Sequence, residues 1–330
     1  MKRTNLGSTG LEISRLGLGA WAIGGNLWGP QDDADSIATI HHAVDRGINW
    51  IDTAAIYGNG HSETVVGQAL SSLGTAERPY IFTKGGLFWH EGERVKTGNS
   101  ASLQLQVEQS LTRLGVEVID LYQMHWPADD VPLEDYWQAL LDLKQQGKVR
   151  HVGLSNHDAE QLRRCEALGH VETLQPPFSM IRRDVAADIL PWCASHQTGV
   201  IVYSPMQSGL LTGAFDRQRL ANLDPSDFRH NDAQFVGAAF ERNLALIEAV
   251  RPVAERHGVT LGTIALAWVL AWPAVSGAIV GARRPGQIDD WTSSAELELT
   301  AEDLAEIAAA IQATGAGNGP ALPPAKGSVS

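Results

Sequence analysis

The sequence has few cysteines, few basic residues and no long apolar run. Only Cys165 and Cys193 are cysteines, too few for a disulfide framework and typical of proteins that stay in a reducing compartment. The 25 Lys and Arg residues are outnumbered by 38 Asp and Glu residues, which gives a formal net charge of −13 and argues against nucleic acid or an anionic membrane as a partner. No apolar run reaches the length of about 18 residues that a membrane-spanning helix needs, and the polar, glycine-broken start does not resemble a signal peptide. We therefore expect a cytoplasmic protein, monomeric by default, that acts on small molecules.

The chain does have an apolar content of 44% and a regular alternation of short β-type runs with amphipathic helical stretches. The eight β-type runs are 14–20, 48–54, 80–86, 118–125, 149–156, 172–178, 199–205 and 276–282. Most of them are apolar throughout, as in strands that are covered on both faces. Eight repeats of strand and helix in this length predict an α/β fold, a closed (β/α)8 TIM barrel, rather than an open sheet. Residues 3–14, with Gly7 and Gly10 around a polar turn, predict a β-hairpin before the first barrel strand.

Two segments interrupt the alternation. Residues 206–239 are long and polar, which predicts a loop, and loops of that length in compact domains are usually functional or disordered. Residues 315–330 are rich in Gly, Pro and Ser, which predicts a disordered tail. No linker divides the remainder, so residues 1–314 are expected to form a single barrel domain.

Polar side chains stand where the apolar runs end. Asp52 follows NWI, Lys84 follows IFT, His125 follows YQM, and Tyr57 lies in the loop just beyond Asp52. The carboxyl ends of barrel strands meet at one rim, so these four side chains are expected to form one site. A neighbouring ammonium group lowers the pKa of a phenol, a carboxylate fixes the ammonium group, and an imidazole orients an oxygen. This set suits proton delivery to a carbonyl oxygen.

Reduction of a carbonyl also needs a hydride, which no side chain supplies, so a cofactor is required. The later strand ends carry groups that suit a dinucleotide: a ring to stack on its nicotinamide (Tyr203), polar groups for the carboxamide (Ser155, Asn156, Gln175), backbone N–H groups for the pyrophosphate (204–210) and guanidinium groups for a further phosphate (Arg283, Arg284). We therefore expect a nicotinamide cofactor across the rim.

Seven segments carry these residues, and together they resemble the aldo-keto reductase superfamily over about residues 3–312. They are 6–21, INWIDTAAIYGNGHSE (48–63), FTKGG (82–86), DLYQMHWP (120–127), GKVRHVGLSN (147–156), VIVYSPMQSGLLTG (200–213) and IVGARRPGQI (279–288). The pattern is most similar to the bacterial branch with SPxxxGLLTG and GARxxxQ.

The resemblance implies a role for each residue of the catalytic tetrad and a cofactor. Tyr57 would be the general acid, with its pKa lowered by Lys84; Asp52 would pair with Lys84, and His125 would orient the substrate. The implied cofactor is NADP(H), with NAD(H) as the second choice, and no metal is expected. The implied cofactor contacts are Ser155, Asn156, Gln175, Tyr203, Ser204, Pro205, Gln207, Ser208, Gly209, Leu210, Gly281, Arg283 and Gln287, with Arg283 or Arg284 facing a 2′-phosphate.

One position departs from the family pattern. Asp290 and Trp291 stand where the family usually has Glu-Asn, whose Asn contacts the adenine. Trp291 would either stack on the adenine or turn away. The resemblance therefore says least about the contacts at the adenosine end. The choice between NADP(H) and NAD(H) depends on those contacts.

The substrate pocket and the rival functions depend on loop residues. Four tryptophans in strand-end loops are expected to wall an apolar pocket: Trp21, Trp28, Trp89 and Trp126. The substrate would be an aldehyde or ketone, or the matching alcohol. Two alternatives remain: a non-catalytic nicotinamide-binding barrel with a regulatory or scaffold role, and a serine hydrolase built on Ser155, because residues 153–157 approach the G-x-S-x-G pattern.

Overall fold

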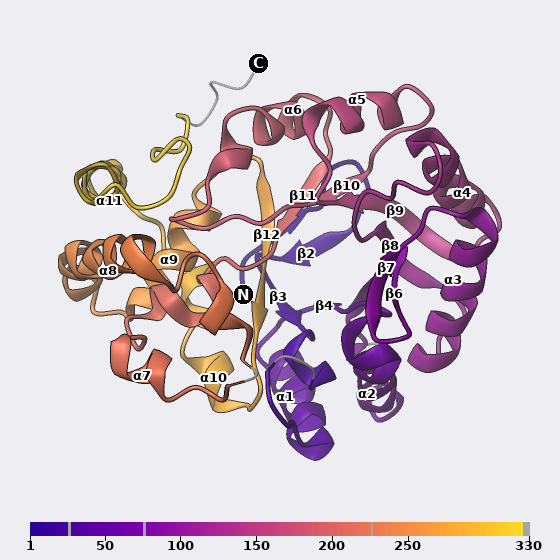
Figure 1. Ribbon diagram of the computed structural model, residues 1–330, viewed down its shortest axis with the longest axis horizontal. Coiled ribbons are helices and arrows are strands. Elements are labelled where there is room, and N and C mark those ends of the chain that lie inside the picture. The colour runs from indigo at the N-terminus through magenta and orange to yellow at the C-terminus, as the bar shows by residue number, and fades with distance from the viewer. Residues whose placement is uncertain (26–27, 75–76, 226, 326–330) are drawn as a thin grey trace.

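The computed structural model describes residues 1–25, 28–74, 77–225 and 227–325, which form a closed barrel of eight parallel strands (Figure 1). The hydrogen-bonded order is β10-β11-β12-β3-β4-β5-β8-β9, closing on itself. The strands are β3 (Leu16–Gly19), β4 (Trp50–Asp52), β5 (Tyr80–Gly85), β8 (Ile119–Met124), β9 (Val149–Ser155), β10 (Thr173–Gln175), β11 (Gly199–Val202) and β12 (Val275–Gly281). Each overlaps one predicted β-type run, and the predicted (β/α)8 barrel is confirmed.

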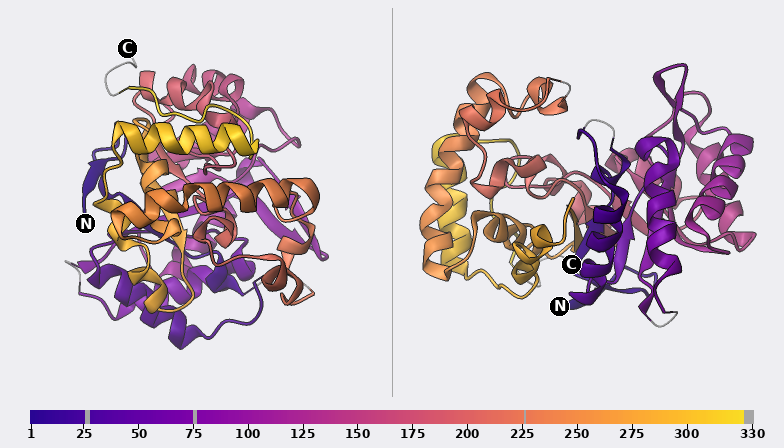
Figure 2. Two further views of the ribbon diagram at one scale, coloured as in Figure 1. Left: turned by 90° about the vertical axis from the view of Figure 1, so that its left-hand side faces the viewer. Right: turned by 90° about the horizontal axis from the view of Figure 1, so that it is seen from below.

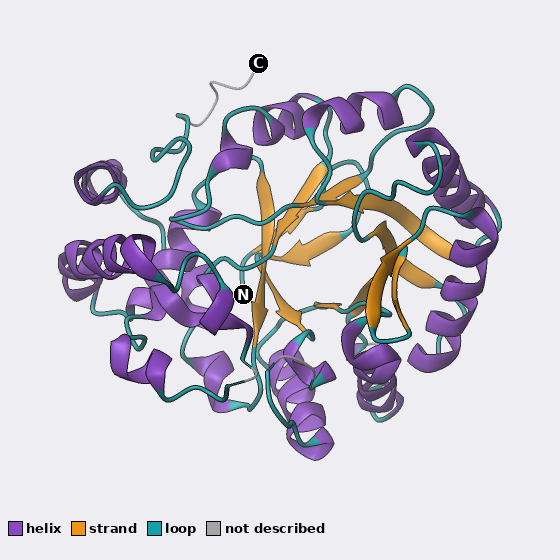
Figure 3. Cartoon of the chain, viewed as in Figure 1, coloured by secondary structure: helices purple, strands orange, loops and turns teal. Residues whose placement is uncertain are grey.

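Helices surround the barrel on its outside (Figure 3). The longer ones are α1 (Asp33–Asp45), α2 (His61–Ser71), α3 (Ser100–Leu114), α4 (Leu133–Gln145), α5 (Ala159–Glu166), α6 (Ile189–Ser195), α8 (Gly237–His257), α9 (Leu261–Leu270) and α11 (Ala301–Thr314). In the left view of Figure 2, α8 and α11 run side by side on one flank, and α8 also contacts α9. Among the residues that the structure describes, no helix is long and apolar enough to cross a membrane.

Side-chain caps and glycines set where these helices begin and end. The Asp32 carboxylate accepts from the Asp35 N–H group at 3.0 Å and caps α1. Asn99 caps α3 in the same way through the N–H group of Ser102. Gly115 then ends α3 with a φ of 64°, a left-handed conformation that glycine adopts without a steric penalty.

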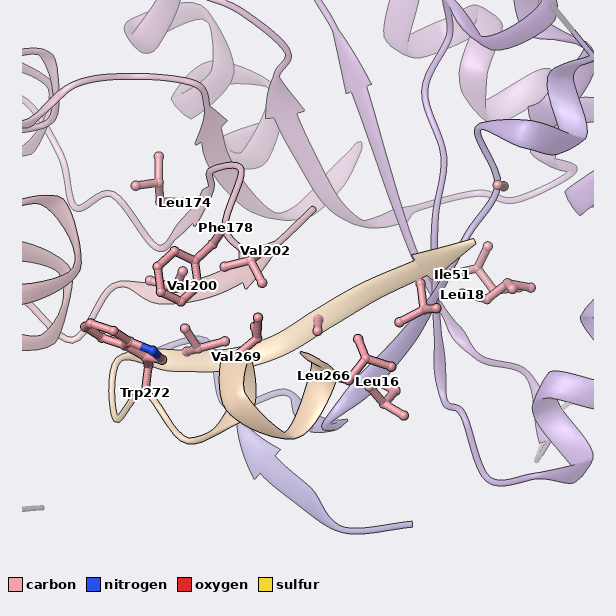
Figure 4. Packing of buried hydrophobic residues seen from close by; sticks show 14 of the residues in the cluster. Leu16, Leu18, Ile51, Leu174, Phe178, Val200, Val202, Leu266, Val269 and Trp272 are labelled. Atoms are coloured by element: carbon pink, nitrogen blue, oxygen red, sulfur yellow. The ribbon is translucent and has the colours of Figure 1, made fainter. Parts of the chain in front are cut away.

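Two apolar layers hold the barrel together. The outer layer lies between strands and helices, and Figure 4 shows Leu16 and Val202 of the strands near Leu266 and Val269 of α9. The inner layer fills the barrel itself, and its members are Leu6, Leu11, Ile13, Trp50, Phe82, Leu121, Ile201 and Ile279.

The first three residues of this inner layer belong to the N-terminal hairpin, β1 (Arg3–Asn5) paired antiparallel with β2 (Glu12–Ser14). The predicted hairpin is confirmed, and it plugs the barrel floor. Glycine at position 17 leaves space for the Trp50 indole in this inner layer, because a Cβ on Gly17 would lie 2.3 Å from that ring.

The insertions on the barrel differ in part from the predictions. Residues 206–239 are not a plain loop: they contain the short helices η5 (Gln207–Thr212), α7 (Arg217–Ala221) and η6 (Phe228–Asn231), and α8 begins at Gly237. A second hairpin, β6 (Leu87–His90) with β7 (Glu93–Lys96), follows β5 and was not predicted. Its strands are short and largely solvent-facing, so the sequence shows little apolar alternation there.

The predicted disordered tail is wrong for residues 315–325. Ala316 is only 1% exposed, and the buried Arg183 guanidinium donates to the carbonyl groups of Ala316 at 3.1 Å and Gly319 at 3.2 Å. The N–H group of Arg183 donates to Asn318 at 3.2 Å. A buried guanidinium group needs acceptors, and this segment supplies them despite its composition. Residues 326–330 lie outside the described residues.

Candidate active site

Asp52 and Lys84 form a buried ion pair at the ends of neighbouring strands. Lys84 Nζ donates to Asp52 Oδ1 at 2.6 Å and to the carbonyl of Thr53 at 2.9 Å. Burial lowers the pKa of Lys84 and raises the pKa of Asp52, while the attraction between the two groups opposes both shifts. From across the barrel, Gln175 Nε2 donates to Asp52 Oδ2 at 2.8 Å. Asp52 therefore has a partner on each oxygen and is held rigidly.

Tyr57 lies in the turn that follows Asp52, at the start of η2 (Tyr57–Gly60). Its ring centroid is 5.3 Å from Lys84 Nζ and 5.7 Å from the His125 ring centroid. This turn meets the β3–α1 loop backbone to backbone, because a Cβ on Gly24 would lie 2.7 Å from the Gly58 nitrogen. The structure thus brings Tyr57, Lys84, Asp52 and His125 together, as expected.

The protonation state of Tyr57 differs from the simplest expectation. Burial, and then the charge of Asp52, raise the pKa of the Tyr57 phenol well above its ordinary value. The expected net lowering by Lys84 is therefore not seen, because Asp52 offsets the ammonium charge and burial disfavours the phenolate. The phenol is protonated at neutral pH, which is the form that a proton donor requires.

His125 follows β8 and is neutral. Its backbone N–H group donates to the Gly85 carbonyl at 3.0 Å, and burial, then Lys84, lower the pKa of the His125 ring well below its ordinary value. Its buried Nδ1 has no hydrogen-bond partner among the described residues. A neutral imidazole has one N–H donor and one acceptor, so this ring can donate to a substrate oxygen without carrying a charge.

Polar groups of the next strand ends surround the tetrad. Asn156 has a left-handed backbone with a φ of 65°. Its Nδ2 donates to the His125 carbonyl at 3.0 Å, and its Oδ1 accepts from Tyr203 Oη at 2.8 Å. Ser155 Oγ donates to the Gln175 carbonyl at 2.8 Å. The predicted carboxamide and stacking residues therefore lie together beside the tetrad.

His157 lies behind this group and was not predicted to matter. Its Nδ1 is 2.9 Å from the Ser155 carbonyl, and its Nε2 is 2.7 Å from Tyr136 Oη. Because a carbonyl only accepts, Nδ1 carries the proton and Nε2 accepts from Tyr136. Burial lowers the pKa of His157 to about 4.

The contacts of His157 bear on the hydrolase alternative. No histidine in the part of the chain that the structure describes is hydrogen-bonded to Ser155 Oγ. Activation of a serine needs such a base. Ser155 is also only 1% exposed, so the geometry does not support a serine hydrolase at this position.

The segment 204–210 follows β11 and has an unusual backbone. Ser204, Gln207, Ser208 and Gly209 have φ values of 54°, 46°, 53° and 93°. Turns that combine right-handed and left-handed residues can direct backbone N–H groups toward one side and form a concave anion site; here the N–H groups of Gln207 and Gly209 are bonded within the segment, to the carbonyl groups of Ser204 and Met206. This geometry suits the predicted pyrophosphate contact of residues 204–210.

All four predicted pocket tryptophans lie near Tyr57. The ring centroid of Trp21 is 6.3 Å from that of Tyr57 and 5.2 Å from that of Trp28. On the other side, Trp89 and Trp126 pack with Tyr57 against the small apolar cluster of Ala54, Ile56 and Leu87.

The prediction missed Phe228 and its neighbours in the long 206–239 segment. The Phe228 ring centroid lies 5.5 Å from that of Trp21 and 5.2 Å from that of Trp28. Arg229 stacks over Trp28 at 5.2 Å, pairs with Asp227 at 2.7 Å and donates to the Ser208 carbonyl at 3.2 Å. The one available signal was an aromatic residue inside the polar sequence DFRH.

The adenosine end is arranged differently from the expectation. The Arg283 side chain is bonded to residues 28–31 of the β3–α1 loop, and Gln287 Oε1 accepts from the Arg283 N–H group at 2.7 Å. Arg284 and Gly281 are exposed. Trp291 is 4% exposed and packs in the core, so it turns away from the rim rather than offering a face to adenine.

The comparison with known families matches this arrangement. The model of the Aldo/keto reductase family matches residues 15–312. The chain belongs to the aldo/keto reductase family. The predicted resemblance and the predicted enzyme class, an aldo-keto reductase, are therefore confirmed.

Similar proteins support this aldo-keto reductase assignment over the full length. The chain is 35% identical over 308 residues to aldo-keto reductase YhdN of Bacillus subtilis (93% of this chain, 92% of the relative). It is 34% identical over 330 residues to the NADH-specific methylglyoxal reductase of Escherichia coli (94% and 100%). Among solved structures, the glycerol dehydrogenase AKR11B4 of Gluconobacter oxydans is 36% identical, with a TM-score of 0.88 and coverage of 96% and 97%. The holo form of AKR11C1 of Bacillus halodurans is 25% identical, with a TM-score of 0.77 and coverage of 94% and 96%.

Proposed function

We propose that this protein reduces an aldehyde or ketone to an alcohol, or catalyses the reverse, with NADP(H) as the preferred cofactor and Tyr57 as the proton donor. The observation that carries the proposal is the convergence of Tyr57, Lys84, Asp52 and His125 at one end of the barrel. The protonated phenol and the neutral imidazole contact each other edge-on, with ring centroids 5.7 Å apart. Such preorganised donors act where charge develops in the transition state.

In this proposal the two donors have separate tasks. His125 donates a hydrogen bond to the carbonyl oxygen and orients it, and the Tyr57 phenol gives its proton to the same oxygen as negative charge develops there. The nearby Lys84 ammonium group then favours the phenolate that remains, and Asp52 keeps Lys84 in place. When bound, the nicotinamide supplies the hydride.

The residues at the rim fit a nicotinamide dinucleotide. The segment 204–209, in which Ser204, Gln207, Ser208 and Gly209 are left-handed, would hold the pyrophosphate, and the Tyr203 ring would lie against the nicotinamide. Hydrogen bonds would reach the carboxamide from Ser155, Asn156 and Gln175. The remaining contacts of this proposal are Pro205, Leu210, Gly281 and Gln287.

The preference for NADP(H) rests on the positive charge after β12. Arg284 is exposed, and within the described residues it forms no ion pair, so its guanidinium group is available for a 2′-phosphate. The relative from Escherichia coli is named as NADH-specific. NAD(H) therefore stays the alternative cofactor.

The proposed substrate is a small carbonyl compound or alcohol. The names of two similar proteins refer to methylglyoxal and glycerol, both small. Trp21, Trp28, Trp89 and Trp126 add apolar walls that suit a flat or aromatic group. We also propose that the enzyme acts as a cytoplasmic monomer, which is consistent with two buried, free cysteines.

The test combines cofactor binding with turnover. Titration with NADPH and then NADH, followed by quenching of tryptophan fluorescence, is expected to give saturable binding of both and tighter binding of NADPH. In a panel of aldehydes, Tyr57→Phe should lower kcat by roughly 10²–10⁴-fold, the usual contribution of a general acid, and keep cofactor affinity.

Three results would speak against this scheme. Binding of neither nicotinamide would contradict the reductase. Binding without turnover of any carbonyl would favour the non-catalytic barrel. Near-normal turnover by Tyr57→Phe would remove Tyr57 from its role.

A further inference from the structure

Arg283 joins the last loop of the barrel to the first. Its Nε donates to Gln31 Oε1 at 2.6 Å, its Nη1 donates to the Trp28 carbonyl at 3.0 Å, and its Nη2 donates to the Pro30 carbonyl. All three guanidinium nitrogens are thus engaged with residues 28–31. The two segments come from opposite ends of the barrel sequence, and α1 and α10 (Gly286–Asp289), which follow them, lie side by side in Figure 1.

The contact is reciprocal. Gln31 Nε2 donates back to the Arg283 carbonyl at 2.9 Å and to Ser36 Oγ of α1 at 3.1 Å. Gln287 fixes the other side of Arg283 by accepting from its N–H group at 2.7 Å. We call this set, Gln31, Arg283 and Gln287, the Arg283 clasp.

The Arg283 clasp is continuous with the aromatic wall above Tyr57. Trp28, whose carbonyl it holds, packs edge-on against Trp21 at 5.2 Å and Phe228 at 5.2 Å. Trp21 in turn lies 6.3 Å from Tyr57, ring centroid to ring centroid. Loss of the clasp would free the loop that carries Trp28 and loosen this wall.

We propose that Arg283 is a positioning residue for the Trp28 wall of the carbonyl pocket, and that its neighbour Arg284 alone reads the 2′-phosphate of the cofactor. The proposal rests on the proposed reductase function. The two adjacent arginines receive different roles because the Arg283 guanidinium group is bonded to residues 28–31, whereas the Arg284 guanidinium group is exposed.

The physical reason is that Arg283 is already fixed in one orientation. Three of its five N–H groups are bonded to Gln31, Trp28 and Pro30, and a bidentate contact to phosphate needs two parallel N–H groups in a suitable direction. Turning the guanidinium group toward a phosphate would break these bonds and leave their acceptors without a donor. Arg284 has no such commitment within the described residues. A 2′-phosphate is therefore read at lower cost by Arg284.

The experiment compares Arg283→Ala, Arg283→Lys and Arg284→Ala, with Arg251→Ala as a control, since Arg251 is half-buried on α8 and pairs with Glu248 of the same helix. For Arg283→Ala we expect KM for an aromatic aldehyde to rise roughly 10-fold with a smaller change in kcat, consistent with the loss of several charge-assisted hydrogen bonds. Its ratio of Kd values for NADH and NADPH should stay within about 3-fold of the wild-type ratio. Arg283→Lys should rescue little, because an ammonium group cannot reproduce the planar fork.

Arg284→Ala should give the opposite pattern. The Kd for NADPH should rise roughly 10-fold while that for NADH changes little, since only the phosphate contact is lost. The proposal is overturned if Arg283→Ala removes the discrimination between NADPH and NADH, or if it leaves the aldehyde KM unchanged. Arg251→Ala should match the wild type in every measurement.

A second readout separates this proposal from the proposed function. The near-UV circular dichroism of the cofactor-free protein reports the packing of Trp28 against Trp21 and Phe228; it should change in Arg283→Ala and match the wild type in Arg284→Ala. If the wild-type protein binds no nicotinamide, the reductase proposal fails whatever the spectra show. If the wild-type protein binds the cofactor and turns over normally but the spectra of both variants match its own, only the Arg283 clasp fails.

Discussion

The proposed catalytic tetrad and the Arg283 clasp lie at the same end of the barrel, but different parts of the structure hold them in place. Asp52, Lys84 and His125 end or directly follow strands whose neighbours are fixed by the barrel register, with Asp52 paired to Phe82 and Lys84 to Gln123. The clasp joins two loops through side-chain hydrogen bonds. Under the proposed function, the comparison teaches that the barrel fixes the residues of the proton chemistry, while loop contacts shape the pocket and the cofactor preference.

The largest effect is expected when the buried ammonium group of Lys84 is removed from the strand-held tetrad. Lys84→Met leaves the Asp52 carboxylate buried with Gln175 as its remaining side-chain partner, and should lower the free energy of unfolding by about 3–5 kcal/mol. The measurement is urea unfolding at neutral pH. Lys84→Met combined with Asp52→Asn should recover much of that loss, since no unpaired charge remains. A double variant as unstable as Lys84→Met would mean that packing, rather than charge, dominates at this position.

A second test concerns His157, which lies behind the residues proposed to hold the nicotinamide, and follows the stability of the protein as the pH changes. The pKa of His157 is lowered by burial to about 4, below the value of about 6.5 that histidine has in an unfolded chain. As pH falls below about 6.5, the unfolded state binds a proton before the folded state does, so the protein loses stability from about pH 6.5 down to 4. The loss from this group is roughly 3 kcal/mol.

The check is to compare the pH dependence of urea unfolding in the wild type and in His157→Gln. The variant should show a shallower decline over this window, even if it is less stable at pH 7. His125, whose pKa is also lowered, remains in both proteins and keeps part of the decline. Equal slopes in the two proteins would show that His157 does not stay neutral in the folded state.

The same comparison explains what could be predicted from sequence. Asp52, Lys84 and His125 were predicted because a polar residue after an apolar run marks a strand end, and the barrel rule brings strand ends together. The Arg283 clasp could not be predicted, because it depends on the path of the loop that carries Gln31, which no periodic pattern specifies. The packed segment 315–325 was mistaken for a disordered tail because composition does not show that Arg183 needs its carbonyl groups.

The smallest effect is expected at Phe228, a loop residue of the aromatic wall. Its ring packs against Trp21 and Trp28, and pairs of this kind contribute about 0.5–1.5 kcal/mol beyond area burial. Phe228→Ala should therefore raise KM for an aromatic aldehyde about 2- to 10-fold and leave KM for a small aliphatic aldehyde nearly unchanged, because only the larger substrate reaches that wall. Steady-state kinetics with both substrates provide an internal control. An equal rise for both would mean that Phe228 acts on the tetrad itself, and the division between a rigid catalytic rim and an adjustable loop wall would have to be given up.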